Sequence, residues 1–153
     1  MTGPAPGKLR LKARVLLCSS KRCVEIPCDV YLHVKGWSLA RVTHLDLESP
    51  LLNEIMPPGG HTYCPIKFEN SVLRVKLREP AYSKALGILV REIRVESEDL
   101  ASAIPSGTSS WAYLGGKAGG VFLGLRREII AKLEDFARSL GVEPRGSRKA
   151  DTA

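Results

Sequence analysis

Residues 8–15 alternate strictly between basic and apolar side chains, reading Lys-Leu-Arg-Leu-Lys-Ala-Arg-Val. Successive side chains of a β-strand point to opposite faces of the sheet, so this segment, as a strand, has one apolar and one cationic face. A surface that serves solubility alone mixes charges of both signs. The pattern therefore predicts a half-buried strand whose outer face meets a polyanion through four cations: Lys8, Arg10, Lys12 and Arg14.

The next segment predicts an antiparallel partner for this strand. Residues 19–22 read Ser-Ser-Lys-Arg and suit a four-residue loop. With Cys18 opposite Cys23, one face of the hairpin is apolar along its whole length, and Arg10 lies beside Tyr31 on the other face. A slip by one residue would mix the two faces, so the register is strongly specified. The same register predicts a disulfide between Cys18 and Cys23.

The composition bears on how the cysteines are read. The chain has no Gln and only two Asn, at positions 53 and 70, a depletion that is typical of thermophiles. Hyperthermophile cytosols tolerate disulfides, so the predicted pair is compatible with a cytoplasmic protein. The chain has no C-x-x-C pair, and a zinc site using His61 and Cys64 would be unusual. We therefore expect no metal site and interpret Cys28 as a small buried hydrophobe.

Histidine and aspartate side chains gather on one predicted sheet face. Residues 35–38, Lys-Gly-Trp-Ser, predict a tight turn after which residues 39–47 return antiparallel. This register puts Asp29 opposite His44, with His33 and Asp46 on the same face. We interpret the group as a cross-strand Asp29–His44 ion pair. The alternative is a general-base arrangement, in which a carboxylate holds an imidazole.

The rest of the chain predicts shorter strands and three helices. Ser49 and Pro50 are typical of a helix start. A second hairpin is expected over 63–68 and 71–78, with Pro65 favouring an edge position. Further expected elements are a strand over 86–96 (a helix over 80–95 being the alternative), a short helix from Ser97, a strand over 111–114, and a helix from Leu125 to Leu140 that ends before Gly141.

These elements predict an α+β fold, a mainly antiparallel sheet of five to six strands backed by a C-terminal amphipathic helix. At 153 residues the chain is expected to form a single domain over 8–141, with flexible tails at 1–7 and 142–153. No apolar run approaches the roughly 18 residues that span a bilayer, and the first residues lack the apolar core of a signal peptide. We therefore expect a cytoplasmic protein with no membrane partner.

Charge and pattern together predict a binding surface. The chain has 23 Lys and Arg against 16 Asp and Glu, a net charge of +7, which favours an anionic partner. Residues 73–78 repeat the basic–apolar alternation. Cations two residues apart on a strand are about 6.5–7 Å apart, close to the phosphate spacing of an extended single strand. The predicted nucleic-acid-binding residues are Lys8, Arg10, Lys12, Arg14, Tyr31, Trp37, Arg74, Lys76 and Arg78.

A glycine-rich segment offers a second candidate site for phosphate. Gly115, Gly116, Lys117, Gly119 and Gly120 precede the predicted C-terminal helix, and backbone N–H groups there could face a phosphate. The segment does not match the P-loop pattern. The alternative interpretations are a flexible linker or a close approach of two backbones.

The favoured function is non-catalytic binding of single-stranded DNA or RNA, with aromatic stacking and no cofactor. One alternative for the basic strands is a solvated sheet face, neutralised by Glu25, Asp29 and Asp46. Two other function classes remain open. The first is an assembly module, such as a ribonucleoprotein subunit or a homo-oligomer formed through the helix over 125–140. The second is an enzyme acting on nucleic acid or a phosphorylated substrate, using the Asp29/His44 face or Lys117.

Overall fold

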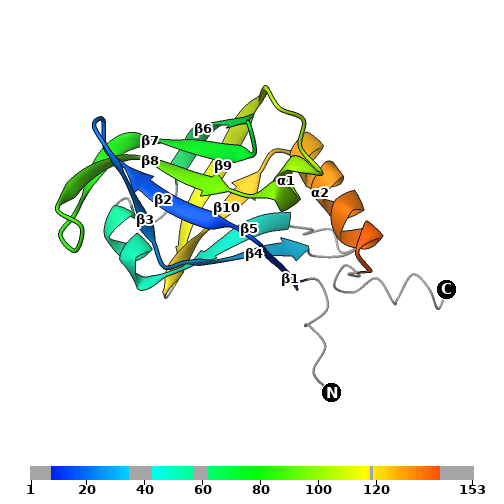
Figure 1. Ribbon diagram of the computed structural model, residues 1–153, viewed down its shortest axis with the longest axis horizontal. Coiled ribbons are helices and arrows are strands. Elements are labelled where there is room, and N and C mark those ends of the chain that lie inside the picture. Colours follow the sequence, from blue (N-terminus) through cyan, green and yellow to red (C-terminus); the bar gives the residue numbers. More distant parts are fainter. Residues whose placement is uncertain (1–7, 35–42, 57–61, 118, 142–153) are drawn as a thin grey trace, which may run out of the picture.

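The computed structural model describes residues 8–34, 43–56, 62–117 and 119–141. Ten strands form one antiparallel sheet in the order β1-β4-β5-β10-β9-β6-β7-β8-β2-β3 (Figure 1). Among the described residues, no helix is long and apolar enough to cross a membrane. The elements are β1 (Lys8–Leu11), β2 (Arg14–Cys18), β3 (Cys23–Ile26), β4 (Asp29–Val34), β5 (Thr43–Glu48), η1 (Pro50–Ile55), β6 (Thr62–Glu69), β7 (Val72–Ser83), β8 (Ile88–Glu96), α1 (Glu98–Ala101), β9 (Thr108–Lys117), β10 (Gly120–Leu125) and α2 (Arg127–Ser139).

The predicted fold class, five to six strands backed by a helix, is wrong. The sheet has ten strands and curls into a half-barrel, while α2 lies at one end of it (Figure 1). Apolar side chains from every part of the sheet, including Leu17, Leu47 and Ile93, share one buried core. A sheet can bury its apolar face against another layer or by curling upon itself, and this chain does the second. The helix is therefore a cap on the core rather than a covering layer.

The first hairpin is confirmed in its predicted register. β1 pairs with β4 and β2 with β3, and the partners run without a shift from Lys8 opposite His33 to Cys18 opposite Cys23. β4 continues the sheet through β5, whereas β2 continues it through β8. One long hairpin therefore joins the two ends of the strand order, which explains how a single pattern near the start of the chain shapes the whole sheet.

The predicted register of the next strand pair is wrong by four residues. Asp29 lies opposite Glu48, and His33 lies opposite His44, so the predicted Asp29–His44 ion pair does not form. The predicted turn at 35–38 lies outside the described residues. Because side chains alternate with a period of two, a shift of four leaves every residue on its predicted face. Asp29, His33, His44 and Asp46 thus still share one face.

Of the other predicted elements, one strand is confirmed, and the position of Pro65 and the bounds of the C-terminal helix differ from the prediction. The strand expected over 86–96 is confirmed as β8, so the alternative helix over 80–95 is excluded. Pro65 lies in a central strand, β6, so the predicted edge position is wrong. A proline is tolerated there because the pairing of β6 with β7 begins only at Ile66. The missing N–H of Pro65 therefore costs no bond to β7. The predicted helix over 125–140 is shorter, α2, and Leu125 ends β10 instead.

The apolar stripe of α2 is used within this chain. Ile129, Leu133 and Ala137 are buried and belong to the core of the sheet. Leu140, just past the helix, is the exposed large apolar residue at this end. The prediction of a homo-oligomer depended on this stripe, of which the structure places Ile129, Leu133 and Ala137 in the core.

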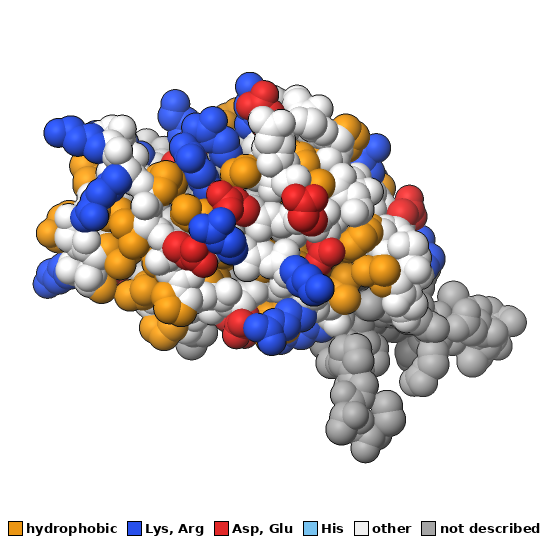
Figure 2. Space-filling model, viewed as in Figure 1, with side chains coloured by type: hydrophobic (Ala, Val, Ile, Leu, Met, Phe, Trp, Pro, Cys, Tyr) orange, Lys and Arg blue, Asp and Glu red, His pale blue; other side chains and the backbone are white. Residues whose placement is uncertain are grey.

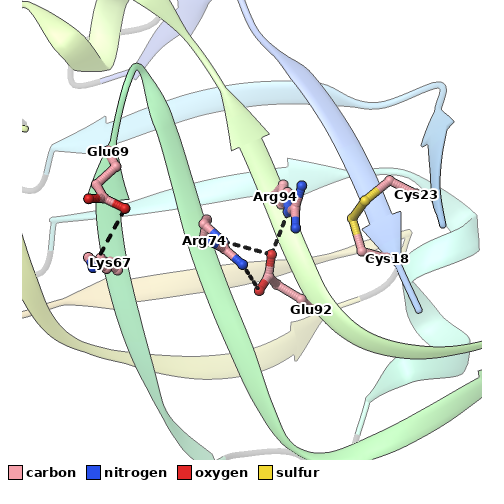
Figure 3. Close-up of polar contacts among 7 residues, drawn as sticks. All are labelled: Cys18, Cys23, Lys67, Glu69, Arg74, Glu92 and Arg94. Carbon is pink, nitrogen blue, oxygen red and sulfur yellow. Dashed lines mark hydrogen bonds and ion pairs between the residues drawn. A yellow bond between two sulfur atoms is a disulfide. The ribbon is translucent and has the colours of Figure 1, made fainter. Parts of the chain in front are cut away.

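Cys18 and Cys23 form the predicted disulfide (Figure 3). Cys28 and Cys64 are free. Burial, with a smaller contribution from the charge of Asp29, raises the pKa of the Cys28 thiol to about 12, and burial also raises the pKa of Cys64. Both free cysteines are therefore protonated at neutral pH and poor nucleophiles.

A thiol count tests this assignment. Unfolded, unreduced protein is expected to react with two equivalents of a thiol reagent, and reduced protein with four. Folded protein should react slowly at both free cysteines, because little thiolate is present. Four reactive thiols in freshly unfolded, unreduced protein would contradict the disulfide, provided that the sample had never met a reductant.

Candidate nucleic-acid interface

Three of the four predicted cations of the first strand, Lys8, Arg10 and Arg14, are matched by carboxylates. The ammonium of Lys8 lies 3.6 Å from Glu48, and Arg10 binds Asp29 at 2.8 Å. Arg14 binds Glu25 at 2.8 Å and Glu96 at 2.9 Å. The hydrogen bond from Arg14 holds the pKa of Glu25 below its ordinary value. Of the predicted phosphate-binding residues on this strand, these three are therefore engaged in surface ion pairs, as the solvated-face alternative expects.

On the second basic strand, β7, and its neighbour β8, arginines outnumber the carboxylates that bind them. Glu92 on β8 accepts hydrogen bonds from both Arg74 and Arg94, the first at 3.0 Å (Figure 3). Burial raises the pKa of Glu92, but the hydrogen bonds and charges of the two arginines outweigh it, so this pKa lies below its ordinary value. One carboxylate therefore serves two arginines, and a positive charge is left over.

An open groove of about 530 Å³ lies over this part of the sheet. Among the described residues, Lys76 and Arg126 form no ion pair, and both line the groove. Figure 2 shows a group of Lys and Arg side chains over β7 and β8. The groove is lined by four cations, one carboxylate and an indole among other groups: Pro65, Ile66, Lys67, Arg74, Lys76, Glu92, Ser109, Ser110, Trp111 and Arg126.

Trp111 supplies an exposed aromatic surface in this groove. It lies opposite Pro65 on β6 and is 40% exposed. The guanidinium of Arg78 lies 5.8 Å from the centre of the indole ring, and its Nε donates a 2.7 Å hydrogen bond to the Tyr63 carbonyl. Tyr63 itself is 60% exposed. Arg78, predicted as a phosphate contact, thus also holds Trp111 and the β6 backbone together.

Of the two aromatic residues predicted for stacking, the structure describes only Tyr31, which lies outside the groove. The ring of Tyr31 is half-buried, and the ammonium of Lys8 lies 4.2 Å from its centre. Trp37 lies outside the described residues. Tyr31 does not line the groove, and the structure brings together the second basic strand and Trp111 instead.

The glycine-rich segment is a strand hairpin, and the prediction of a loop before a helix is wrong. Gly115 and Gly116 belong to β9 and pair with β10, which intervenes before α2. A Cβ on Gly120 would lie 2.1 Å from the Leu47 carbonyl oxygen. This glycine therefore permits a close approach of β10 and β5, as the packing alternative expects. The Lys117 side chain lies outside the described part of the chain.

Comparison of the chain with known proteins assigns no family or function to this groove. No family model, curated protein or solved structure matches it. The assignment of function therefore rests on the groove itself.

The sequence reasoning missed Lys67, Trp111 and Arg126 as groove residues. The signal for Trp111 was the alternation of 111–114, which places Ala112 and Leu114 in the core and Trp111 on the outer face. Lys67 shows the same alternation along β6. Arg126 carries no such signal, because it lies between β10 and α2 and reaches the groove only through the fold.

The Arg74–Glu92–Arg94 cluster yields a pH prediction. Because the folded-state pKa of Glu92 is lowered, its ionised form stabilises the fold above its unfolded-state pKa, and this stability is lost as pH falls through the folded-state pKa. Glu92→Gln is expected to lower the free energy of unfolding by about 1–3 kcal/mol at neutral pH, with the difference closing in acid.

Denaturant unfolding at several pH values measures this difference. The matched control is Glu69→Gln, which removes the exposed ion pair with Lys67 (Figure 3) and should cost less than about 1 kcal/mol. A stability difference for Glu92→Gln that persists unchanged in acid would show that the carboxylate charge is not its source.

Proposed function

We propose that this chain binds single-stranded DNA or RNA through the groove over β6–β9, without catalysis. The observation that carries the proposal is that Lys76 and Arg126, which form no ion pair with any described residue, share one groove with exposed Trp111. A cationic channel that follows the backbone, combined with aromatic side chains that stack on bases, is the general arrangement for single-strand binding. The net charge of +7 supports the same class of partner.

The exposed indole favours an unpaired strand over a duplex. The guanidinium of Arg78 lies near the ring of Trp111, but the Trp111 side chain is still exposed, so ring surface remains for a base. In a duplex the base faces are stacked on one another, whereas the bases of a single strand are free to stack on a protein side chain. Ser109 and Ser110, which also line the groove, add hydroxyl groups for hydrogen bonds.

The first basic strand takes a lesser part in this proposal. A phosphate that binds Lys8, Arg10 or Arg14 must compete with the carboxylates that already hold these side chains. Lys76 has no such competitor among the described residues. We therefore expect Lys76→Ala to weaken binding more than Arg10→Ala.

Fluorescence anisotropy with labelled single-stranded and double-stranded oligonucleotides, at several salt concentrations, tests the proposal. Affinity for the single strand should fall steeply with salt, because each neutralised phosphate releases a counterion. Lys76→Ala should make the slope of log affinity against log salt shallower by about 0.7, the value per phosphate for a single strand.

The matched control is Arg22→Ala, which removes an exposed arginine from the loop of the first hairpin. It carries the same change in net charge, but Arg22 lies in the loop between β2 and β3 and does not line the groove. Equal losses for Lys76→Ala and Arg22→Ala would show that binding follows net charge alone. Absence of binding at low salt would overturn the proposed function.

A further inference from the structure

Two histidines and an aspartate lie together on the outer face of β4 and β5. His44 and Asp46 are two residues apart on β5, so their side chains leave the same face of the sheet. His33 lies directly opposite His44 on β4. Each residue offers one potential ligand atom, and these three atoms lie within 4.8 Å of one another. The β4–β5 register thus assembles the cluster, and the groove residues take no part in it.

The cluster is shielded from water by its neighbours. The side chain of Asp46 is 8% exposed and that of His44 is 15% exposed. Tyr31 on β4 and Phe122 on β10 lie opposite Asp46 on its two sides. The His44 ring stacks on His33, with ring centres 4.8 Å apart, and meets Phe122 edge-on at 5.3 Å. Aromatic walls of this kind orient the imidazoles and lower the local dielectric.

The polar atoms of His44 point to a missing ligand. Its Nε2 lies 3.1 Å from Asp46 Oδ1. Its Nδ1 is buried and makes no hydrogen bond to any described residue. Buried nitrogen atoms in folded proteins are nearly always hydrogen-bonded or bound to a metal, because an unsatisfied one costs free energy.

We propose that His33, His44 and Asp46 bind one divalent transition-metal ion of the zinc class. Zinc ligands of this type lie about 2.0–2.2 Å from the metal, which places neighbouring ligand atoms roughly 3.3–3.5 Å apart. Atoms now within 4.8 Å reach that spacing by small side-chain rotations. Two imidazoles with one carboxylate suit zinc or ferrous iron, whereas magnesium and calcium prefer sites made of oxygen ligands. Three protein ligands leave a further coordination position open.

Titration calorimetry with zinc ion, on full-length protein freed of metal by a chelator, tests the site. One zinc ion per chain is expected. His44→Phe keeps an aromatic ring between His33 and Phe122 while removing both ring nitrogens, and Asp46→Asn removes the carboxylate charge at the same size. Each variant should lose more than about 100-fold in affinity, because removing a ligand costs more than removing an outer hydrogen-bond partner.

The matched control is Asp29→Asn, since Asp29 lies on the same face of β4 but binds Arg10. Its zinc affinity should equal that of the unchanged chain. The proposed site would be overturned if His44→Phe and Asp46→Asn bound zinc as tightly as Asp29→Asn does. The absence of one-to-one binding in the unchanged chain would also overturn it.

Cobalt substitution gives a readout that needs no variant. Histidine and carboxylate ligands give visible cobalt bands without the near-ultraviolet sulfur-to-cobalt transition. That transition would instead assign the metal to Cys28 or Cys64 and overturn the proposal. Should His44→Phe fail to fold, His33→Ala and the cobalt spectrum of the unchanged chain decide the question. Loss of oligonucleotide binding in the groove variants would leave this result unaffected, because the two sites share no residue.

Discussion

Trp111→Ala is expected to weaken binding of a single-stranded oligonucleotide by about 1–3 kcal/mol, which corresponds to roughly 5-fold to 150-fold in affinity. The indole is 40% exposed within the cationic groove, so its removal deletes a stacking surface rather than a part of the core. Loss of one base–aromatic stack carries this free energy whichever base occupies it, because every base has a π-face. Anisotropy titrations at one salt concentration measure the change.

Tryptophan fluorescence provides the matched control, because the chain has only two tryptophans. Oligonucleotide binding should quench the emission. The quenching should disappear in Trp111→Ala and survive in Trp37→Ala. The reverse result would move the binding surface to the turn predicted at 35–38 and would contradict the groove, even though nucleic-acid binding itself would stand.

Gly120→Ala is expected to destabilise the fold by at least about 2 kcal/mol. The added Cβ would lie 2.1 Å from the Leu47 carbonyl oxygen and 3.0 Å from the Glu48 Cα, and both of these are backbone atoms of β5. Relief of this contact requires β10 and β5 to separate, which disturbs the pairing that links the His33–His44 strands to the rest of the sheet. Denaturant unfolding, followed by circular dichroism, measures the loss.

Gly116→Ala is the control for that substitution. Its Cβ would lie 2.8 Å from Met56 Cε, the end of a flexible side chain that can rotate away. We expect a loss of less than about 1 kcal/mol. Equal stability of the two variants would show that the close approach of β10 to β5 does not explain Gly120, and would favour the phosphate-loop interpretation of this segment.

The outer-face assignments of the first hairpin could be read from the sequence because they depend on a period of two. In β1 and β2 a one-residue slip would turn the basic residues into the core, so the alternation and the Cys18–Cys23 pair leave one register. The same argument fails for β4 and β5. A four-residue shift keeps every side chain on its face, so the pattern cannot distinguish His33–His44 from Asp29–His44 pairing.

For the candidate sites too, the face on which a residue lies was predictable from the sequence, whereas its neighbours were not. The face on which Arg74, Lys76 and Arg78 lie was predictable from their alternation with buried residues. Their neighbours were not, because the groove draws on β6, β7, β8, β9 and Arg126, and strand order in a ten-stranded sheet is set by long-range pairing. The carboxylates that neutralise Arg14 likewise come from β3 and β8.

The sequence alone therefore determined local properties: which residues are half-buried, which face each strand presents, and which cysteines pair. Only the tertiary structure decided how the apolar face is buried, which of the described cations form ion pairs, and which side chains meet across strands. The physical reason is that alternation is a property of single strands, whereas curvature, strand order and even-numbered register shifts depend on the free energy of the whole core. The groove with Trp111 and the His33–His44–Asp46 cluster both arise at that second level.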